Sequence, residues 1–144
     1  MQSRNAFTLI ELIFVIVVLG ILASIAIPKF AATRDDAHIA KARSTIAALK
    51  SAIVNERQAR LFRGDNDWIT KLNYQSSTIF DSNVSGGSQL LMYPVKTSTA
   101  KGHWSIETDG SVYKFNLGNN SATFTYNNAN GTFTCTDGAC SLYE

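Results

Sequence analysis

The stretch FTLIELIFVIVVLGILASIAI, residues 7–27, decides the fold of this chain. Glu11 is its only charged residue, and the other polar side chains are the small hydroxyls of Thr8 and Ser24. A helix of this length spans roughly 31 Å, which matches the hydrocarbon core of a bilayer. The apolar run is too long for a secretory signal peptide, and helix-compatible sequence continues beyond it. The sequence therefore predicts a retained transmembrane helix over residues 7–28.

Glu11 is the residue of this stretch that needs a chemical explanation. A carboxylate inside a membrane costs several kcal/mol unless it is paired or protonated, so such residues are usually functional. The alternative is that Glu11 lies near the interface and only favours the positive end of the helix dipole.

The residues around Glu11 resemble the start of type IV pilins and type II secretion pseudopilins. A short polar leader precedes Ala6-Phe7-Thr8-Leu9-Ile10-Glu11, and Gly20 and Pro28 stand where this family commonly has them. The resemblance covers roughly residues 1–55, somewhat over a third of the chain. It departs from the family pattern at Ala6, where glycine is usual.

The resemblance implies how the N-terminus is processed. A prepilin peptidase would remove the leader, residues 1–6, by cutting between Ala6 and Phe7, and would methylate the new amine of Phe7. In a staggered array of helices that amine would meet Glu11 of a neighbouring subunit, and the pairing would offset the desolvation of both charges. Glu11 would then set the register of a filament, with no catalysis by this chain.

Gly20 and Pro28 predict a soft segment within the helix. Pro28 deprives the Ser24 carbonyl of its helical hydrogen bond, and Gly20 has a weak helix propensity. The resemblance implies that residues 20–28 melt or extend when a filament packs. An ordinary membrane-helix kink is the alternative.

Beyond Pro28 the apolar residues follow a helical period. Ala32, Ile39, Ile46 and Ile53 recur every seven residues, and Ala42 and Leu49 lie between them. Together these six residues form the seam. This pattern predicts an amphipathic periplasmic helix over residues 29–61, continuous with the membrane half from about Phe7 to about Leu61. Because a long isolated helix is unstable, the rest of the chain must cover this seam. Gly64 is expected to end the helix.

Charge divides the chain into thirds. Residues 1–28 are neutral, residues 29–63 carry eight basic against three acidic side chains, and residues 64–144 carry four against seven, for a total of +2. The basic third fits DNA phosphates, which makes a component of a competence-type DNA-uptake pilus the alternative function. A solvated helix face is the simpler interpretation.

The sequence gives little sign of catalysis or metal binding. It gathers no nucleophile, base and oxyanion site, so we expect no enzyme and no cofactor. Asp65-Asn66-Asp67 offers oxygens that suit calcium, but the spacing completes no calcium loop and a turn is the simpler interpretation. His38 and His103 lie far apart in the sequence, so no metal site is expected.

The remainder predicts a small antiparallel sheet packed on the helix, an α+β fold. Residues 62–89 are interpreted as a linker region and residues 90–144 as the sheet domain. Strands are expected at residues 89–95, 103–107, 111–117, 122–126 and 132–135, with turns at Asp109-Gly110 and at residues 127–131. Pro94 limits the first strand to an edge. Three aromatic residues are expected to face the helix: Phe124, Tyr126 and Phe133.

Cys135 and Cys140 enclose a four-residue turn. In a chain with one export-type helix, this pair suits a disulfide formed in an oxidising compartment, and a zinc half-site lacks partners. The disulfide would tie the last strand to the C-terminal tail. Type IV pilins often carry a C-terminal disulfide loop, although a larger one.

The resemblance also implies a location and partners. The chain would cross the bacterial inner membrane once, with its N-terminus in the cytoplasm and its sheet domain in the periplasm, before it joins a periplasmic or extracellular filament. Its partners would be the prepilin peptidase, identical or homologous subunits, an assembly-platform membrane protein and, through it, an assembly ATPase. The filament would be a type II secretion pseudopilus or a type IV pilus.

Overall fold

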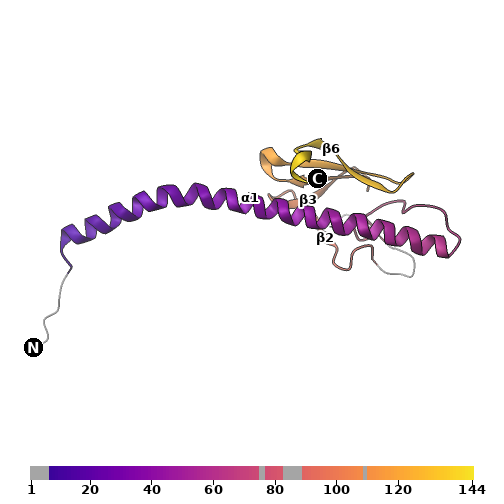
Figure 1. Cartoon of the computed structure of the whole chain (residues 1–144), viewed down its shortest axis with the longest axis horizontal. Helices are drawn as coiled ribbons and strands as arrows, with labels where there is room; N and C mark the ends of the chain where they lie inside the picture. The colour runs from indigo at the N-terminus through magenta and orange to yellow at the C-terminus, as the bar shows by residue number, and fades with distance from the viewer. Residues whose placement is uncertain (1–6, 75–76, 83–88, 109) are drawn as a thin grey trace, which may run out of the picture. The chain divides into compact units, whose positions relative to one another are not determined.

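The computed structural model describes residues 7–74, 77–82, 89–108 and 110–144 (Figure 1). The predicted leader and the turn residue Asp109 lie outside them, as does the side chain of Ala32. The chain divides into two compact units, residues 1–36 and 37–144. One helix, α1 (Leu9–Phe62), contributes to both units, and a C-terminal antiparallel sheet completes the α+β fold that the sequence predicted.

Helix α1 ends in a Schellman motif, within one residue of the predicted end. The Gly64 N–H donates to the Leu61 carbonyl at 3.0 Å, and the Asp65 N–H donates to the Arg60 carbonyl at 3.0 Å. Gly64 has a φ of 81°, a left-handed conformation that glycine adopts without a steric penalty. The two bonds satisfy carbonyls that would otherwise be left open at the helix end.

A four-stranded antiparallel meander forms the C-terminal sheet, in the order β3-β4-β5-β6. The strands are β3 (His103–Thr108), β4 (Val112–Asn116), β5 (Ala122–Asn127) and β6 (Thr132–Gly138). Four of the predicted strands are therefore confirmed, and β6 runs three residues further than expected. The β5–β6 turn at residues 128–131 is closed by the Gly131 N–H, which donates to the Asn127 carbonyl at 2.8 Å.

The strand predicted at residues 89–95 is wrong. Only Val95 belongs to a strand, the two-residue β2 (Val95–Lys96), which pairs with β1 (Thr78–Ile79). The Leu90 N–H donates instead to the Ser82 carbonyl and the Leu91 N–H to the Phe80 carbonyl, so this segment folds against the preceding loop. Pro94 has no N–H to offer to a strand ladder, which favours this outcome.

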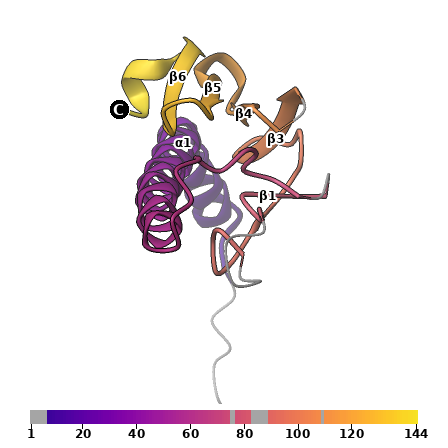
Figure 2. The same cartoon turned by 90° about the vertical axis from the view of Figure 1, so that its right-hand side faces the viewer.

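The core lies between the second half of α1 and the inner face of the meander. The seam residues Ala42, Ile46, Leu49 and Ile53 are buried in one cluster with sheet aromatics that include Phe124, Tyr126 and Phe133. The predicted contact between these aromatics and the helix is thereby confirmed. Figure 2 shows the strands curving over one side of the helix. Ile69, Leu72, Ile79 and Phe80 of the intervening loop complete the cluster.

Candidate functional site

The first turn of α1 carries a capping box built from Thr8 and Glu11. The Glu11 N–H donates to Thr8 Oγ1 at 3.3 Å, and Glu11 Oε2 accepts the Thr8 N–H at 3.3 Å. The Thr8 hydroxyl also lies 3.2 Å from Glu11 Oε2. This reciprocal pattern satisfies two N–H groups that a helix start leaves open. Sequence reasoning missed it, although Thr-x-x-Glu at a helix start is its signature.

Among the described residues, nothing compensates the charge of Glu11. All of its hydrogen bonds come from neutral donors and reach Oε2, so within the described residues Oε1 has no donor and no Lys or Arg pairs with the carboxylate. Phe7, the predicted new N-terminus, lies about one helical turn earlier in the chain, and its side chain is exposed. A cation from another molecule therefore has an open carboxylate oxygen to approach.

The helix around Glu11 presents apolar side chains on every side. Among the described residues, α1 is the one helix long and apolar enough to cross a membrane, and no side chain of its most apolar window is buried. Leu9, Phe14 and Ile25, for example, are each more than 60% exposed. A surface of this kind is stable in lipid or against other apolar helices and unfavourable in water.

Gly20 and Pro28 both lie inside continuous helix. A Cβ at Gly20 would meet nothing within 4 Å, so packing within this chain does not require a glycine there. The Ser24 hydroxyl donates to the Ile21 carbonyl at 2.7 Å, a side-chain bond that competes with the backbone ladder. The predicted softness of residues 20–28 stays a prediction.

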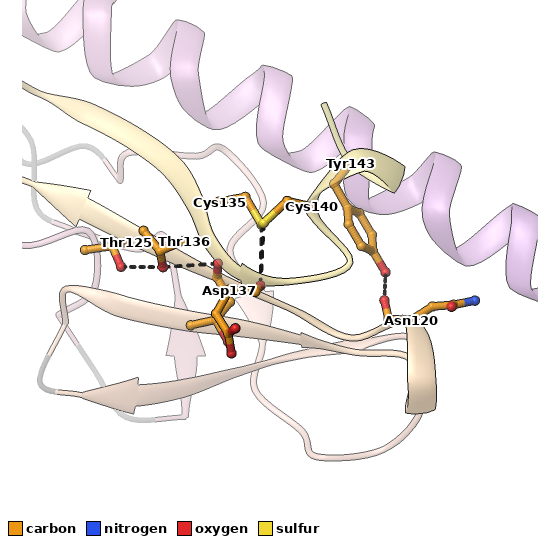
Figure 3. Close-up of a disulfide and its surroundings, with 8 residues drawn as sticks. Asn120, Thr125, Cys135, Thr136, Asp137, Cys140 and Tyr143 are labelled. Atoms are coloured by element: carbon orange, nitrogen blue, oxygen red, sulfur yellow. Dashed lines mark hydrogen bonds between the residues drawn. A yellow bond between two sulfur atoms is a disulfide. The ribbon is translucent and has the colours of Figure 1, made fainter.

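Cys135 and Cys140 form the predicted disulfide (Figure 3). It joins β6 to the short helix η2 (Cys140–Leu142). Hydrogen bonds also hold the tail: the buried Tyr143 donates its hydroxyl to the Asn120 carbonyl at 2.6 Å, and Arg43 Nε of α1 donates to the Leu142 carbonyl at 2.8 Å. The C-terminus is thus fixed to the sheet and to the helix.

Within the described part of the chain, four of the eight basic residues between 29 and 63 have hydrogen-bond, ion-pair or stacking partners. Arg60 pairs with the buried Glu56 at 2.9 Å and with Asp65 at 3.3 Å, and Arg63 lies 3.8 Å from Glu56. Arg43 binds the tail, as described, and Arg57 stacks over Trp68. The other four basic side chains are exposed: Lys29, Arg34, Lys41 and Lys50. These four side chains are the ones most open to phosphate contacts, and the DNA-binding alternative stays a prediction.

The loop after α1 is held by its own hydrogen bonds. Asp65 Oδ1 accepts the Asp67 N–H at 2.9 Å, which forms a turn, and Asp65 Oδ2 accepts a hydrogen bond from Arg60 Nη1 at 3.3 Å. Two buried tyrosines attach the following residues to the sheet. Tyr126 donates to the Ile69 carbonyl at 2.8 Å, and burial raises the pKa of Tyr126 to about 12. Burial also raises the pKa of Tyr113, whose hydroxyl oxygen lies 2.8 Å from Asn73 Oδ1 of the loop and 2.8 Å from the Gly110 carbonyl oxygen of the β3–β4 turn.

Known proteins match this chain in two ways. The family described as the prokaryotic N-terminal methylation motif matches residues 1–27. A fimbrial protein of Pseudomonas aeruginosa is 32% identical over 105 residues, which is 70% of this chain and 67% of that protein. No solved structure matches the chain significantly.

Other relatives match over a shorter length. The type II secretion system core protein G of Klebsiella michiganensis is 46% identical over 52 residues, 36% of this chain and 37% of that protein. The type IV narrow pilus major component PilA5 of Thermus thermophilus is 47% identical over 51 residues, 35% of this chain and 44% of that protein. The chain thus spans about two thirds of the fimbrial protein and less than half of these two. Together with the long apolar helix and the sheet packed on its second half, these matches show that the chain belongs to the family of type IV pilins and type II secretion pseudopilins.

Proposed function

We propose that this chain is cut between Ala6 and Phe7, methylated on the amine of Phe7 and assembled through Glu11 into a helical filament. Family membership supports a structural subunit of a pilus or pseudopilus that assembles with other pilins. The observation that carries the assembly step is the carboxylate of Glu11, which has no cationic partner among the described residues and lies in an exposed apolar stretch, residues 7–27, that holds no other charged residue. A neighbouring subunit's N-terminal amine supplies the missing cation.

The pairing works as a register device because both charges are costly in lipid. A methylated amine and a carboxylate lose their hydration when the helices enter an apolar bundle, and each needs the other as its partner. A neighbouring helix shifted away from the correct stagger leaves both charges unpaired, at a cost of several kcal/mol. Only one stagger is therefore favourable, and repeating it generates a helical filament.

The proposed organisation follows from the same features. Residues 1–6 are the leader, residues 7–28 the membrane helix and residues 29–61 the amphipathic periplasmic helix. A linker region, residues 62–89, leads to the sheet domain of residues 90–144. The apolar helix and the family fit anchoring in the inner membrane. The disulfide supports a periplasmic sheet domain, since such bonds persist in oxidising compartments. Prepilin peptidase, platform protein and assembly ATPase are the proposed partners.

The extent of the matches favours a type IV pilus over a secretion pseudopilus. Helix α1 ends at Phe62, so the 105-residue match to the fimbrial protein must extend beyond the helix. The match to core protein G covers only 52 residues, fewer than the helix and leader supply. The fimbrial match supports a type IV pilus, whereas the pilus component PilA5 matches over as short a stretch as core protein G, so a secretion pseudopilus stays the alternative.

Intact-mass analysis of the protein from native membranes tests the processing step. We expect the loss of residues 1–6, the gain of one methyl group on Phe7 and two hydrogens fewer at Cys135 and Cys140. A native protein that retains its first six residues contradicts the proposal.

The substitution Glu11→Gln separates charge pairing from helix capping. Glutamine also closes a capping box with Thr8, so the helix start is preserved while the negative charge is lost. We expect Glu11→Gln to abolish filaments seen by electron microscopy and to leave the near-UV circular dichroism of the sheet domain unchanged. The matched control is Glu107→Gln, which removes only an exposed pair with Lys114 at 3.9 Å. Normal filaments from Glu11→Gln would show that Glu11 is only a cap.

A further inference from the structure

The chain contains three copies of the pattern Asn-x-Ser/Thr, which begin at Asn83, Asn119 and Asn130. This pattern is the acceptor sequence for N-glycosylation when the middle residue is not proline. Residues 83–85 lie outside the described residues, so the structure compares the other two copies, which both belong to the unit formed by residues 37–144. A three-residue pattern recurs by chance in a segment rich in asparagine, so the geometry of each copy must decide between them.

Asn130 lies in the β5–β6 turn with an exposed side chain, as do the three residues before it. Its Oδ1 accepts two hydrogen bonds from Thr132, one from the hydroxyl at 2.7 Å and one from the N–H at 3.1 Å. Its Nδ2 donates to no acceptor among the described residues. The oxygen of this carboxamide is therefore held, while the nitrogen, which is the atom that a glycan joins, is open to another molecule.

The two hydrogen bonds to Oδ1 favour reaction at the nitrogen. An amide nitrogen is a poor nucleophile because resonance delocalises its lone pair onto the carbonyl oxygen. When Nδ2 loses a proton, negative charge builds up on Oδ1, and donors aimed at that oxygen stabilise the charge. Thr132 supplies two such donors to Asn130. The hydroxyl residue two positions after the asparagine thus has a chemical role at this site.

Asn119 has the same sequence pattern but a different geometry. It is exposed and lies in the short helix η1 (Gly118–Asn120). The Ser121 hydroxyl donates to the Gly118 carbonyl at 2.7 Å and accepts the Leu117 N–H at 2.8 Å. Both bonds fix the turn between β4 and β5, and neither reaches the carboxamide of Asn119. The structure therefore separates two copies that the sequence pattern alone treats as equal.

The β5–β6 turn can carry a large substituent without a change in the core. The Trp68 ring packs directly on the backbone of Gly131, where any Cβ would overlap the indole. Gly131 has a φ of 71°, so glycine suits both its conformation and this contact. The neighbouring Asn130 side chain lies on the exposed surface instead. A sugar on it would displace no buried residue, as is usual for glycosylated asparagines.

We propose that Asn130 Nδ2 is glycosylated by a membrane transferase that uses a sugar linked to a lipid through a diphosphate. Nδ2 attacks the anomeric carbon of the sugar, and a C–N bond forms while the bond from that carbon to the diphosphate oxygen breaks. The lipid diphosphate leaves with the electron pair, and the Nδ2 proton passes to a base of the transferase.

The membrane anchor and the neighbouring residues define this partner further. The inference rests on the periplasmic location proposed above for the sheet domain. Helix α1 would confine the acceptor to the same membrane as the lipid-linked donor, which raises their effective concentration. The residue two positions before Asn130 is the neutral Asn128. The transferase therefore recognises the three-residue pattern without an acidic residue before it.

Mass spectrometry of the protein from native membranes tests the inference in a single peptide. Trypsin cuts after Lys114, and no Lys or Arg follows, so residues 115–144 are released together with both asparagines and both cysteines. We expect a sugar on Asn130, assigned by electron-transfer fragmentation, and an unmodified Asn119. A sugar on Asn119 instead of Asn130, or deamidation as the only change at Asn130, overturns the proposal.

The disulfide in the same peptide separates failure of this inference from failure of the proposed location. An unmodified Asn130 together with an oxidised pair of Cys135 and Cys140 overturns the inference and leaves the periplasmic location supported. An unmodified Asn130 together with two free thiols overturns both.

Variants of exposed residues test the role of the Thr132 hydroxyl. Thr132→Val keeps the shape of the side chain but removes the hydroxyl, so the sugar on Asn130 should be lost, whereas Thr132→Ser should retain it. Asn119→Gln is the matched control for Asn130→Gln: the first should keep the sugar and the second should lose it. Near-UV circular dichroism should be unchanged in all four variants. A sugar that persists on Asn130 in Thr132→Val, or that persists on the peptide in Asn130→Gln, overturns the proposal.

Discussion

The two halves of helix α1 share one secondary structure but depend on different surroundings. In the first unit the apolar side chains of α1 are exposed on all sides, whereas in the second unit they form a seam that the sheet covers. Leu19 is 58% exposed and Leu49 is fully buried, although both are leucines of the same helix. The first half is thus completed by other molecules, lipid or neighbouring pilins, and the second half by its own chain. Stability should depend on the second half and assembly on the first.

Two leucine-to-alanine substitutions, one in each half of α1, test this difference most directly. Leu49→Ala leaves a cavity in the core and should lower the free energy of unfolding of the sheet-bearing unit by about 2–5 kcal/mol. Leu19→Ala removes an exposed side chain and should change it by less than about 0.5 kcal/mol. Urea unfolding of the full chain in detergent, followed by near-UV circular dichroism, measures both. Equal losses would contradict the division between the two halves.

The disulfide gives the next largest expected effect, again confined to the second unit. Replacing both cysteines by serine removes the closed loop from the unfolded chain and should cost about 2 kcal/mol of unfolding free energy. The same unfolding measurement with and without reductant checks this. Reductant should lower the stability of the unaltered protein to that of the variant and leave the variant unchanged. A variant as stable as the oxidised protein would show that Tyr143 and Arg43 hold the tail by themselves.

The accuracy of the sequence-based prediction in each region depends on whether neighbouring residues or distant contacts determine its structure. The seam at Ile46, Leu49 and Ile53 and the stop at Gly64 are periodic or local, and the structure confirms both. The meander is marked by its turn residues. The described residues between 63 and 96 are hard to predict because tertiary contacts fix their conformation. There Asp81 accepts the Tyr74 N–H at 2.8 Å and the Thr78 hydroxyl at 2.6 Å.

Phe80 shows why pattern reasoning fails in that loop. It is fully buried and has a φ of 60°, a left-handed conformation that costs a non-glycine residue about 1–3 kcal/mol. Packing against Trp104 and Tyr113, with ring centroids 5.7 and 5.0 Å away, offsets that cost. No sequence pattern predicts that aromatic packing will offset backbone strain at this residue. The stacking of Arg57 on Trp68, eleven positions further along the chain, is likewise not predictable from the sequence. The Thr8–Glu11 capping box, in contrast, has a local sequence signature from which it could have been predicted.

Alkaline pH should weaken the second unit selectively, since the five tyrosines of the chain all lie in it. Burial raises the pKa of Tyr126 to about 12 in the folded chain, above its ordinary value of 10.0. As pH rises from 10 to 12 the unfolded chain loses this proton first, so the free energy of unfolding falls across that window. Tyr126→Phe should lose its bond to Ile69 at neutral pH but show a shallower alkaline decline.

Unfolding free energies measured at several pH values between 8 and 12 test this sign. Tyr74→Phe, which alters an exposed tyrosine, is the control and should follow the unaltered protein throughout. The remaining alkaline decline in Tyr126→Phe is assigned to Tyr113, whose pKa burial also raises. A decline as steep as in the unaltered protein would mean that Tyr126 is not responsible.

The smallest expected effect lies in the first half of α1, at Gly20. Because a Cβ there meets nothing within 4 Å, Gly20→Ala introduces no clash and should stabilise the local helix by about 1 kcal/mol through propensity alone. Amide hydrogen exchange around residues 18–24 should then slow by roughly fivefold, while the unfolding of the sheet-bearing unit stays unchanged. Unchanged exchange would place the soft point at Pro28 instead. If the slowed helix also fails to form filaments, the glycine serves the extension of the helix during packing, a role that no contact within a single subunit explains.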